Sequence, residues 1–114
     1  EAYLERMLLT LDRASHYYRQ KNLVLGDQYL AKAIDGIDLF VQSLAGIKMA
    51  LNVGLNDQIA LGEATLVSIM HDILEAKRAG NTTELAELLE QDLSQNIKDW
   101  TTKFFPILKS YGRN

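Results

Sequence analysis

Apolar residues return every three or four positions along most of this chain, and the pattern breaks at three places, residues 22–27, 52–62 and 80–83. The repeat is clearest in the stretch that contains Leu30, Ala33, Ile37, Phe40, Leu44, Ile47 and Leu51. Side chains at this spacing share one face of an α-helix. Three breaks predict four amphipathic helices, at about residues 3–21, 27–51, 63–79 and from about 81 towards the C-terminus.

Local signals mark several helix ends. Asp27 is suited to cap the second helix because its carboxylate can accept free backbone N–H groups. Gly80 fits the left-handed conformation that closes a helix. Asn81 stands three residues before Glu84, which is close to a capping box, and Thr82 or Thr83 is the alternative cap. Pro106 lacks an N–H and clashes with the preceding turn, so we expect the last helix to kink or end just before it.

The connections decide how the helices are arranged. Two are short, and only residues 52–62 form a longer irregular segment. Parallel neighbours would need long crossovers, so the pattern predicts an all-α fold, a single antiparallel up-down four-helix bundle over residues 1–114 with a kinked or extended C-terminal helix. Its expected core includes Leu8, Leu11, Ile34, Ile37, Leu44, Leu66, Ile69, Ile73, Leu89, Leu93, Ile97 and Trp100.

Length and composition fit one soluble domain. The chain has 114 residues, 47% of them hydrophobic, and no cysteine. No apolar run approaches the roughly 18–20 residues of a membrane span. The lack of cysteine excludes a disulfide framework and fits a reducing compartment. We therefore expect a cytoplasmic protein with no membrane partner. The chain opens at Glu1 rather than Met, which is typical of a sequence that lacks part of its native N-terminus.

The charge pattern argues against a nucleic-acid partner. The 12 basic residues are scattered among 15 acidic ones, and the formal net charge is −3. Nucleic-acid binding depends on clustered Lys and Arg side chains that neutralise phosphates. No such stripe is visible in the sequence.

Residues suited to catalysis or metal binding are scarce. The two histidines, His16 and His71, fall well away from the apolar stripes of their helices, so both should face solvent. A di-iron bundle needs two Glu-x-x-His motifs, but position 13 is Arg and position 68 is Ser. Carboxylate pairs lie on polar faces, and no nucleophile arrangement is present. We expect no enzyme activity, no catalytic or metal site and no cofactor.

Several apolar residues miss the core stripe of their helix. They are Leu9, Tyr17, Leu39, Leu88 and Phe105. Isolated apolar residues are normal on protein surfaces. The alternative interpretation is that some of them form a patch that docks a partner helix or a second subunit. These five residues are the predicted protein-binding site.

Two segments resemble the flagellin export chaperone family. They are Leu30-Ala-Lys-Ala-Ile-Asp-Gly-Ile37 and Ile73-Leu-Glu-Ala-Lys-Arg-Ala-Gly-Asn-Thr-Thr-Glu-Leu-Ala-Glu-Leu88, and the likeness extends to a tryptophan that resembles Trp100. It spans most of residues 4–100. The family's Tyr-rich segment ahead of the first helix is absent, and the tail 101–114 extends beyond the usual end.

The resemblance implies a function. Proteins of that family are acidic four-helix bundles, so the likeness implies a non-catalytic cytoplasmic chaperone that holds a helical or unfolded segment of a flagellin-like export substrate. The alternative is a homo-oligomeric scaffold, such as a homodimer, or a regulatory bundle with another partner. The sequence leaves these alternatives open.

Overall fold

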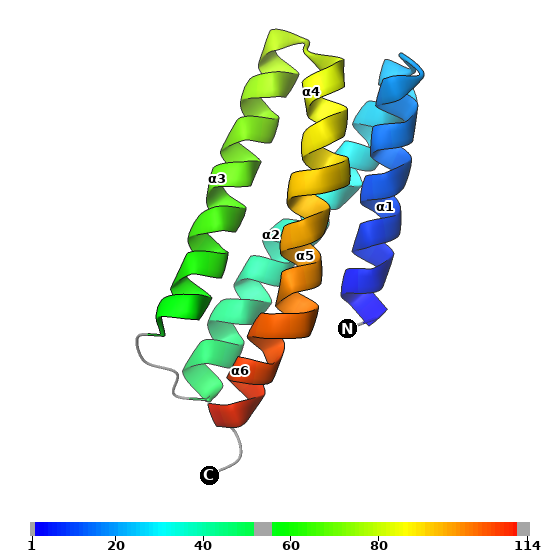
Figure 1. Cartoon of the computed structure of the whole chain (residues 1–114). Coiled ribbons are helices and arrows are strands. Elements are labelled where there is room, and N and C mark those ends of the chain that lie inside the picture. Colours follow the sequence, from blue (N-terminus) through cyan, green and yellow to red (C-terminus); the bar gives the residue numbers. More distant parts are fainter. Residues whose placement is uncertain (1, 52–55, 112–114) are drawn as a thin grey trace.

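The computed structural model describes residues 2–51 and 56–111, and over these residues the all-α prediction is confirmed because the chain forms helices and no strand. Three long helices come first, and a fourth, segmented helical rod completes the fold (Figure 1). The elements are α1 (Ala2–Arg19), α2 (Leu23–Ala50), α3 (Asp57–Ala79), α4 (Thr82–Glu87), η1 (Leu88–Leu93), α5 (Ser94–Asp99), η2 (Trp100–Phe104) and α6 (Phe105–Tyr111).

The rod formed by α4 to α6 lies between α1 and α3, and α2 crosses behind it (Figure 1). Two hydrogen bonds connect α1 to α2. The Tyr18 hydroxyl near the end of α1 donates to Asp27 near the start of α2, while the Tyr3 hydroxyl donates to the Gly36 carbonyl. None of the helices in the described part of the chain is long and apolar enough to cross a membrane.

Two helix starts differ from the prediction. The side chain of Asn22 accepts the backbone N–H of Leu25, so α2 begins at Leu23 and Asp27 is not its cap. Asn56 caps α3, which begins at Asp57 rather than near residue 63. Residues 57–62 of the predicted loop therefore belong to α3, and its residues 52–55 lie outside the described part of the chain.

The end of α3 and the start of α4 follow the prediction. Gly80 has a φ of 69°, the left-handed conformation that closes a helix. The Asn81 side chain accepts the backbone N–H of Glu84 at 3.1 Å and caps α4. Residues that are close in sequence therefore determine the turn between these two helices.

Two π-helical segments change the register of the rod. A π turn closes its hydrogen bond over one more residue than an α turn, so one helical wheel does not describe residues 82–111. Leu88, at the start of η1, is buried with Leu85 and Leu89 on the local apolar face. The prediction that Leu88 faces the surface is wrong for this reason.

The helical path also continues through Pro106. The π-helical segment η2 precedes it, and the N–H of Phe105 bonds to the carbonyl of Trp100 five residues earlier. Pro106 is the second residue of α6, directly after the change from π-helical to α-helical hydrogen bonding. Its missing N–H therefore falls at the first turn of α6, where a proline is tolerated. The helix does not end before Pro106.

The core runs the length of the bundle. The predicted core residues are buried, except that Leu8 and Ile34 are only partly buried and pack against the core. Trp100 is fully enclosed, and its indole N–H donates to the buried Asn96 side chain at 3.1 Å. The rings of Phe40, Phe104 and Phe105 surround it.

Candidate functional site

Three of the predicted binding residues lie at or near the surface, on two helices. Leu9 on α1 is 61% exposed and Leu39 on α2 is 55% exposed. Tyr17 is half-buried, and its ring stacks on that of Tyr29 with 5.5 Å between centroids. Tyr17 is therefore part of the α1/α2 packing rather than a free docking residue.

The other two predicted residues belong to the interior. Leu88 is buried in the core for the register reason given above. Phe105 is half-buried, and its ring lies 6.0 Å from that of Phe40 and 6.2 Å from that of Trp100. Of the five residues, Leu9 and Leu39 are therefore the two that are largely exposed.

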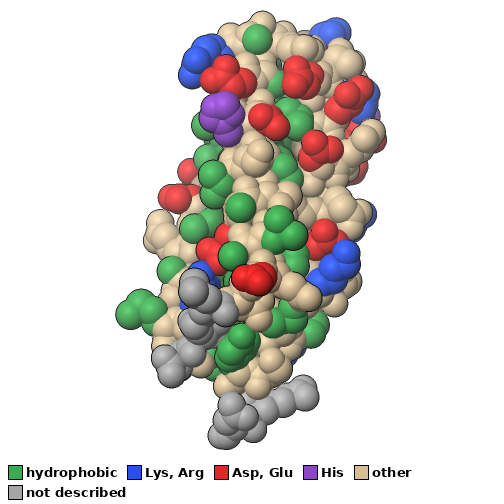
Figure 2. Space-filling model, turned by 60° about the vertical axis from the view of Figure 1, so that its left-hand side comes forward, with side chains coloured by type: hydrophobic (Ala, Val, Ile, Leu, Met, Phe, Trp, Pro, Cys, Tyr) green, Lys and Arg blue, Asp and Glu red, His purple; other side chains and the backbone are tan. Residues whose placement is uncertain are grey.

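The structure instead has an apolar groove between α2 and α3, with a volume of about 430 Å³. We call it the α2/α3 groove. Hydrophobic side chains gather on the face of the molecule to which α3 belongs, and acidic side chains lie among and beside them (Figure 2). The groove is lined by Ile34, Asp35, Ile37, Asp38 and Val41 of α2 and by Leu66, Val67, Met70, His71 and Leu74 of α3.

The groove has a buried floor and exposed walls. Ile37 and Leu66 are buried beneath it, and Met70 is half-buried. The walls include Val67, which is 67% exposed, and Leu74, which is 52% exposed. Large aliphatic side chains are therefore left in contact with solvent along a concave surface, which is the composition expected of a docking groove.

Two ion pairs connect α2 to α3 near the ends of the groove. Lys48 Nζ lies 2.7 Å from Glu63 Oε1, and Lys77 Nζ lies 3.1 Å from Asp27 Oδ1. Between these pairs the two helices meet through side chains, with few close approaches of their backbones. The ion pairs thus connect the helices near both ends while the middle of the seam stays open.

The Asp27 pair is reinforced from α1. The Tyr18 hydroxyl donates to Asp27 Oδ1 at 2.6 Å. This hydrogen bond, together with the Lys77 ammonium, holds the pKa of Asp27 below its usual value although partial burial opposes the shift. Burial and the Asp27 carboxylate raise the pKa of Tyr18 well above its usual value. One carboxylate therefore connects α1, α2 and α3.

The rim of the groove is acidic. Asp35 and Asp38 lie on the α2 side, and both are exposed and take part in no ion pair within the described residues. His71 lies on the α3 side, 3.8 Å from Asp72. An occupant with cations beside its apolar face would neutralise Asp35 and Asp38.

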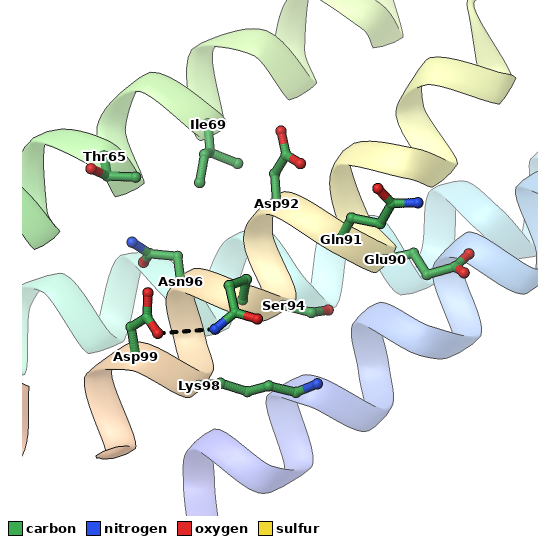
Figure 3. Close-up of a pocket in the computed structure, with 10 residues that line it drawn as sticks. Thr65, Ile69, Glu90, Gln91, Asp92, Ser94, Asn96, Lys98 and Asp99 are labelled. Atoms are coloured by element: carbon green, nitrogen blue, oxygen red, sulfur yellow. Dashed lines mark hydrogen bonds between the residues drawn. The ribbon is translucent and has the colours of Figure 1, made fainter. Parts of the chain in front are cut away.

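A second hollow of about 640 Å³ lies between α3 and the rod, and most of the residues that line it are polar or charged (Figure 3). The Asp92 and Asn96 side chains point toward α3, and the Gln95 amide donates to Asp99 at 3.0 Å. Asn96 is occupied by structural bonds, because it donates to the Gly62 carbonyl and accepts from Trp100. The remaining side chains diverge, so this hollow offers no convergent acid–base pair.

The positions of the histidines and the acidic residues bear on metal binding. His16 and His71 are both exposed, as the helical spacing predicted. Over residues 2–51 and 56–111, no three His, Cys, Asp or Glu side chains come together where they could hold a metal ion. The α2/α3 groove is therefore the candidate functional site.

Sequence reasoning missed this groove although a signal was present. Val67 and Leu74 are seven positions apart and lie outside the stripe formed by Leu66, Ile69 and Ile73. Two aliphatic residues two turns apart on one helix flank are a stronger sign of a docking surface than single residues on different helices. The periodicity of a single helix indicates isolated positions and does not show which flanks of two helices face each other.

Comparison with known proteins gives one family. The family model described as a domain of unknown function (DUF8042) matches residues 1–103, and the chain belongs to this family. No curated protein and no solved structure matches the chain.

Proposed function

We propose that this protein is a non-catalytic binding module and that its α2/α3 groove holds an amphipathic helix of another protein. The observation that carries the proposal is the row of exposed aliphatic side chains, including Val67 and Leu74, on a concave surface with a buried apolar floor. An apolar helix face laid into such a groove removes this surface from water.

The charge of the rim selects the occupant. Asp35 and Asp38 line the groove without cationic partners in the described structure. A docked helix with Lys or Arg beside its apolar stripe would supply those partners, whereas an acidic helix would be repelled. We therefore propose a basic amphipathic helix as the occupant.

The ion pairs near the ends of the groove set its length. Glu63 and Lys77 are 14 positions apart on α3, which corresponds to about 21 Å of helix at about 1.5 Å per residue. An occupant that fits between them has about four turns. Its apolar anchors should recur at positions i, i+4, i+7 and i+11.

The resemblance to flagellin export chaperones gives this module a biological role. We propose a cytoplasmic chaperone that shields a helical segment of a flagellin-like export substrate until its delivery. What supports this role is the likeness of residues 30–37 and 73–88 to that family, together with a groove suited to a helix.

A homo-oligomeric scaffold is the competing proposal. If two copies paired groove to groove, the acidic rims would be brought near one another, and like charges at close range are unfavourable. Asp35 and Asp38 therefore favour a different partner over a second copy at this surface. Sedimentation of the purified protein separates the two, because groove pairing would give a dimer whose dissociation constant rises on Val67→Asp substitution.

A peptide titration tests the function. The probe is a 14-residue peptide with Leu at positions i, i+4, i+7 and i+11 and Lys on the flanks, compared with the same peptide carrying Glu on the flanks. We expect the Lys peptide to bind and Val67→Asp to weaken binding at least about tenfold, because it places a charge on an apolar wall. Leu9→Asp is the matched control, since Leu9 on α1 is exposed to a similar extent and does not line the groove.

Three results would decide the matter. Equal binding of the two peptides, or equal loss in the Leu9 and Val67 variants, would contradict the groove. A C-terminal flagellin peptide that binds wild type and not Val67→Asp supports the export role. Binding of the Lys peptide without binding of the flagellin peptide would retain the groove and reject that role.

A further inference from the structure

A cluster of cations without carboxylate partners lies on the opposite side of α2 from the acidic groove. Arg19, Lys48, Lys77, Arg78 and Lys103 each pair with a carboxylate. Arg6, Arg13 and Lys32 pair with none among the described residues, although all three lie along the α1/α2 seam. In a protein with a net charge of −3, this grouping of free positive charge requires an explanation.

Two of these cations line one hollow. It has a volume of about 270 Å³ and lies between α1 and α2. Its other lining residues are Tyr3, Met7, Thr10, Ala33 and Gly36, so no carboxylate is among them. Arg6 and Lys32 approach this hollow from different helices, which places two positive charges beside a small concave surface.

The floor of the hollow is firmly built. The Tyr3 hydroxyl donates to the Gly36 carbonyl. A Cβ added to Gly36 would lie 3.2 Å from the Tyr3 oxygen and 3.5 Å from Met7 Cε. The absence of a side chain at Gly36 therefore lets Tyr3 and Met7 lie against α2, and with Ala33 they line the hollow beside Arg6 and Lys32.

An aromatic pair restrains the cations beside this hollow. Lys32 Nζ lies 5.0 Å from the centre of the Tyr29 ring, and the Arg13 guanidinium lies 6.0 Å from it. Tyr29 is itself stacked on Tyr17. Cation–π contacts of this kind hold side chains in place without neutralising their charge. One carboxylate, Asp12, lines the next hollow along the seam with Arg13 and does not line the hollow described above.

We propose that the hollow between Arg6 and Lys32 is a binding site for a phosphate monoester. Near neutral pH such a group carries close to two negative charges and three acceptor oxygens, which match the two cations. A guanidinium can hold two phosphate oxygens at once and an ammonium acts as a point charge. A single carboxylate supplies only half of the charge. The site is separate from the α2/α3 groove and does not depend on the function proposed for it.

The test is a titration of the full chain with inorganic phosphate, followed by backbone amide NMR at constant ionic strength set with sodium chloride. We expect saturable shifts at Arg6, Thr10 and Lys32. Arg6→Gln and Lys32→Gln should each weaken binding at least about tenfold, since each removes a charge-assisted contact. Lys98→Gln is the matched control because Lys98 is also without an ion-pair partner in the described residues but lies on α5.

Further measurements identify the kind of molecule that carries the phosphate group and check that each variant is folded. A phosphoserine peptide that binds at least tenfold more tightly than free O-phosphoserine indicates a phosphorylated polypeptide, and equal affinities indicate a small metabolite; both results retain the site. Circular dichroism confirms that each variant is folded, and Arg6→Lys should recover part of the affinity. Shifts reproduced by chloride alone, or an equal loss in Lys98→Gln, would overturn the proposal.

Discussion

The α1/α2 seam and the α2/α3 seam share one helix but differ in the residues that face each other. On its α1 side, α2 places Gly26 beneath the Tyr18 ring and Gly36 beside Tyr3 and Met7. On its α3 side, α2 places branched aliphatic side chains opposite others of the same kind. Glycine lets α1 and α2 come close together, and its absence leaves α2 and α3 separated by a groove.

The α3/rod seam resembles the α1/α2 seam, and we call both closed because a glycine allows close packing in each. A Cβ added to Gly62 would lie 2.6 Å from Phe104 Cε2, so this glycine is what allows the aromatic ring to lie on the backbone of α3. Close backbone approaches thus join α1 to α2 and join the rod to both α1 and α3. The α2/α3 seam is instead joined by ion pairs near its ends. It leaves solvent-exposed apolar surface between them, and such surface is available for a partner.

The largest effect is expected from breaking the closed packing at Trp100. Trp100→Ala should lower the free energy of unfolding by about 3–5 kcal/mol, because it leaves a large cavity and removes the donor that Asn96 accepts. Urea denaturation measures the loss. The comparison on the open seam is Leu74→Ala, for which we expect less than about 1 kcal/mol because Leu74 is half exposed. Similar losses in the two variants would contradict the distinction between the seams.

Two glycines of α2 test the role of close approach. A Cβ at position 26 would lie 2.7 Å from Tyr18 Cδ1, and Tyr18 is buried and cannot move aside, so Gly26→Ala should cost about 1–3 kcal/mol. Nothing lies within 4 Å of a Cβ at position 46. Gly46→Ala should therefore stabilise the protein by up to about 1 kcal/mol through helix propensity. Thermal unfolding of the two variants should shift the midpoint in opposite directions.

These glycines also show what the sequence could and could not predict. Helical periodicity gave the four-helix organisation, and short-range signals such as Gly80 and Asn81 gave the helix ends, because both depend on residues close in sequence. Which helix packs against a glycine, and which aromatic ring lies on it, depends on residues that are distant in sequence. The glycines are visible in the sequence, but their pairing with the rings of Tyr18 and Phe104 is not.

The candidate site was predicted less well than the fold, and for a definite reason. Helical periodicity places a side chain correctly only where the helix keeps one register, and Leu88 lies where the rod contains π turns. Asp27 was assigned to a helix cap because of its local position, whereas it bridges three helices. The groove depends on the separation of α2 from α3, which no single-helix pattern contains.

A smaller effect on the free energy of unfolding is expected when acid protonates Asp27, which bonds to Tyr18 of α1 and Lys77 of α3. Because the pKa of Asp27 is lower in the folded protein than its unfolded value of about 3.9, the unfolded chain binds the proton more readily. The contribution of Asp27 is therefore present above about pH 4 and is lost as the pH falls through the folded pKa. Solvent screening of a carboxylate that is 44% exposed should keep it below about 1 kcal/mol.

The Asp27→Asn variant isolates this contribution. It should be less stable than wild type at pH 7 and should approach wild type at pH 2.5, as measured by urea denaturation at each pH. Tyr18→Phe removes the hydroxyl that donates to Asp27. It should therefore also reduce the stability that is lost between pH 7 and pH 2.5. A difference between Asp27→Asn and wild type that stays constant from pH 7 to pH 2.5 would contradict the assigned role.

The smallest effect on stability is expected in the open groove, and that is the sharpest test of the comparison. Val67→Asp should change the free energy of unfolding by no more than about 0.5 kcal/mol, because the side chain is 67% exposed and the new carboxylate stays hydrated. The same substitution should weaken binding of a basic amphipathic helix at least about tenfold, since that helix would have to desolvate the carboxylate on an apolar wall. A substitution in the core lowers both the stability of the protein and its affinity for a partner. A substitution at a residue that only contacts the partner lowers the affinity alone. Denaturation and peptide titration on the same Val67→Asp sample therefore distinguish a docking groove from a weakly packed part of the core. A stability loss as large as that of Gly26→Ala would show that the α2/α3 seam contributes to the core.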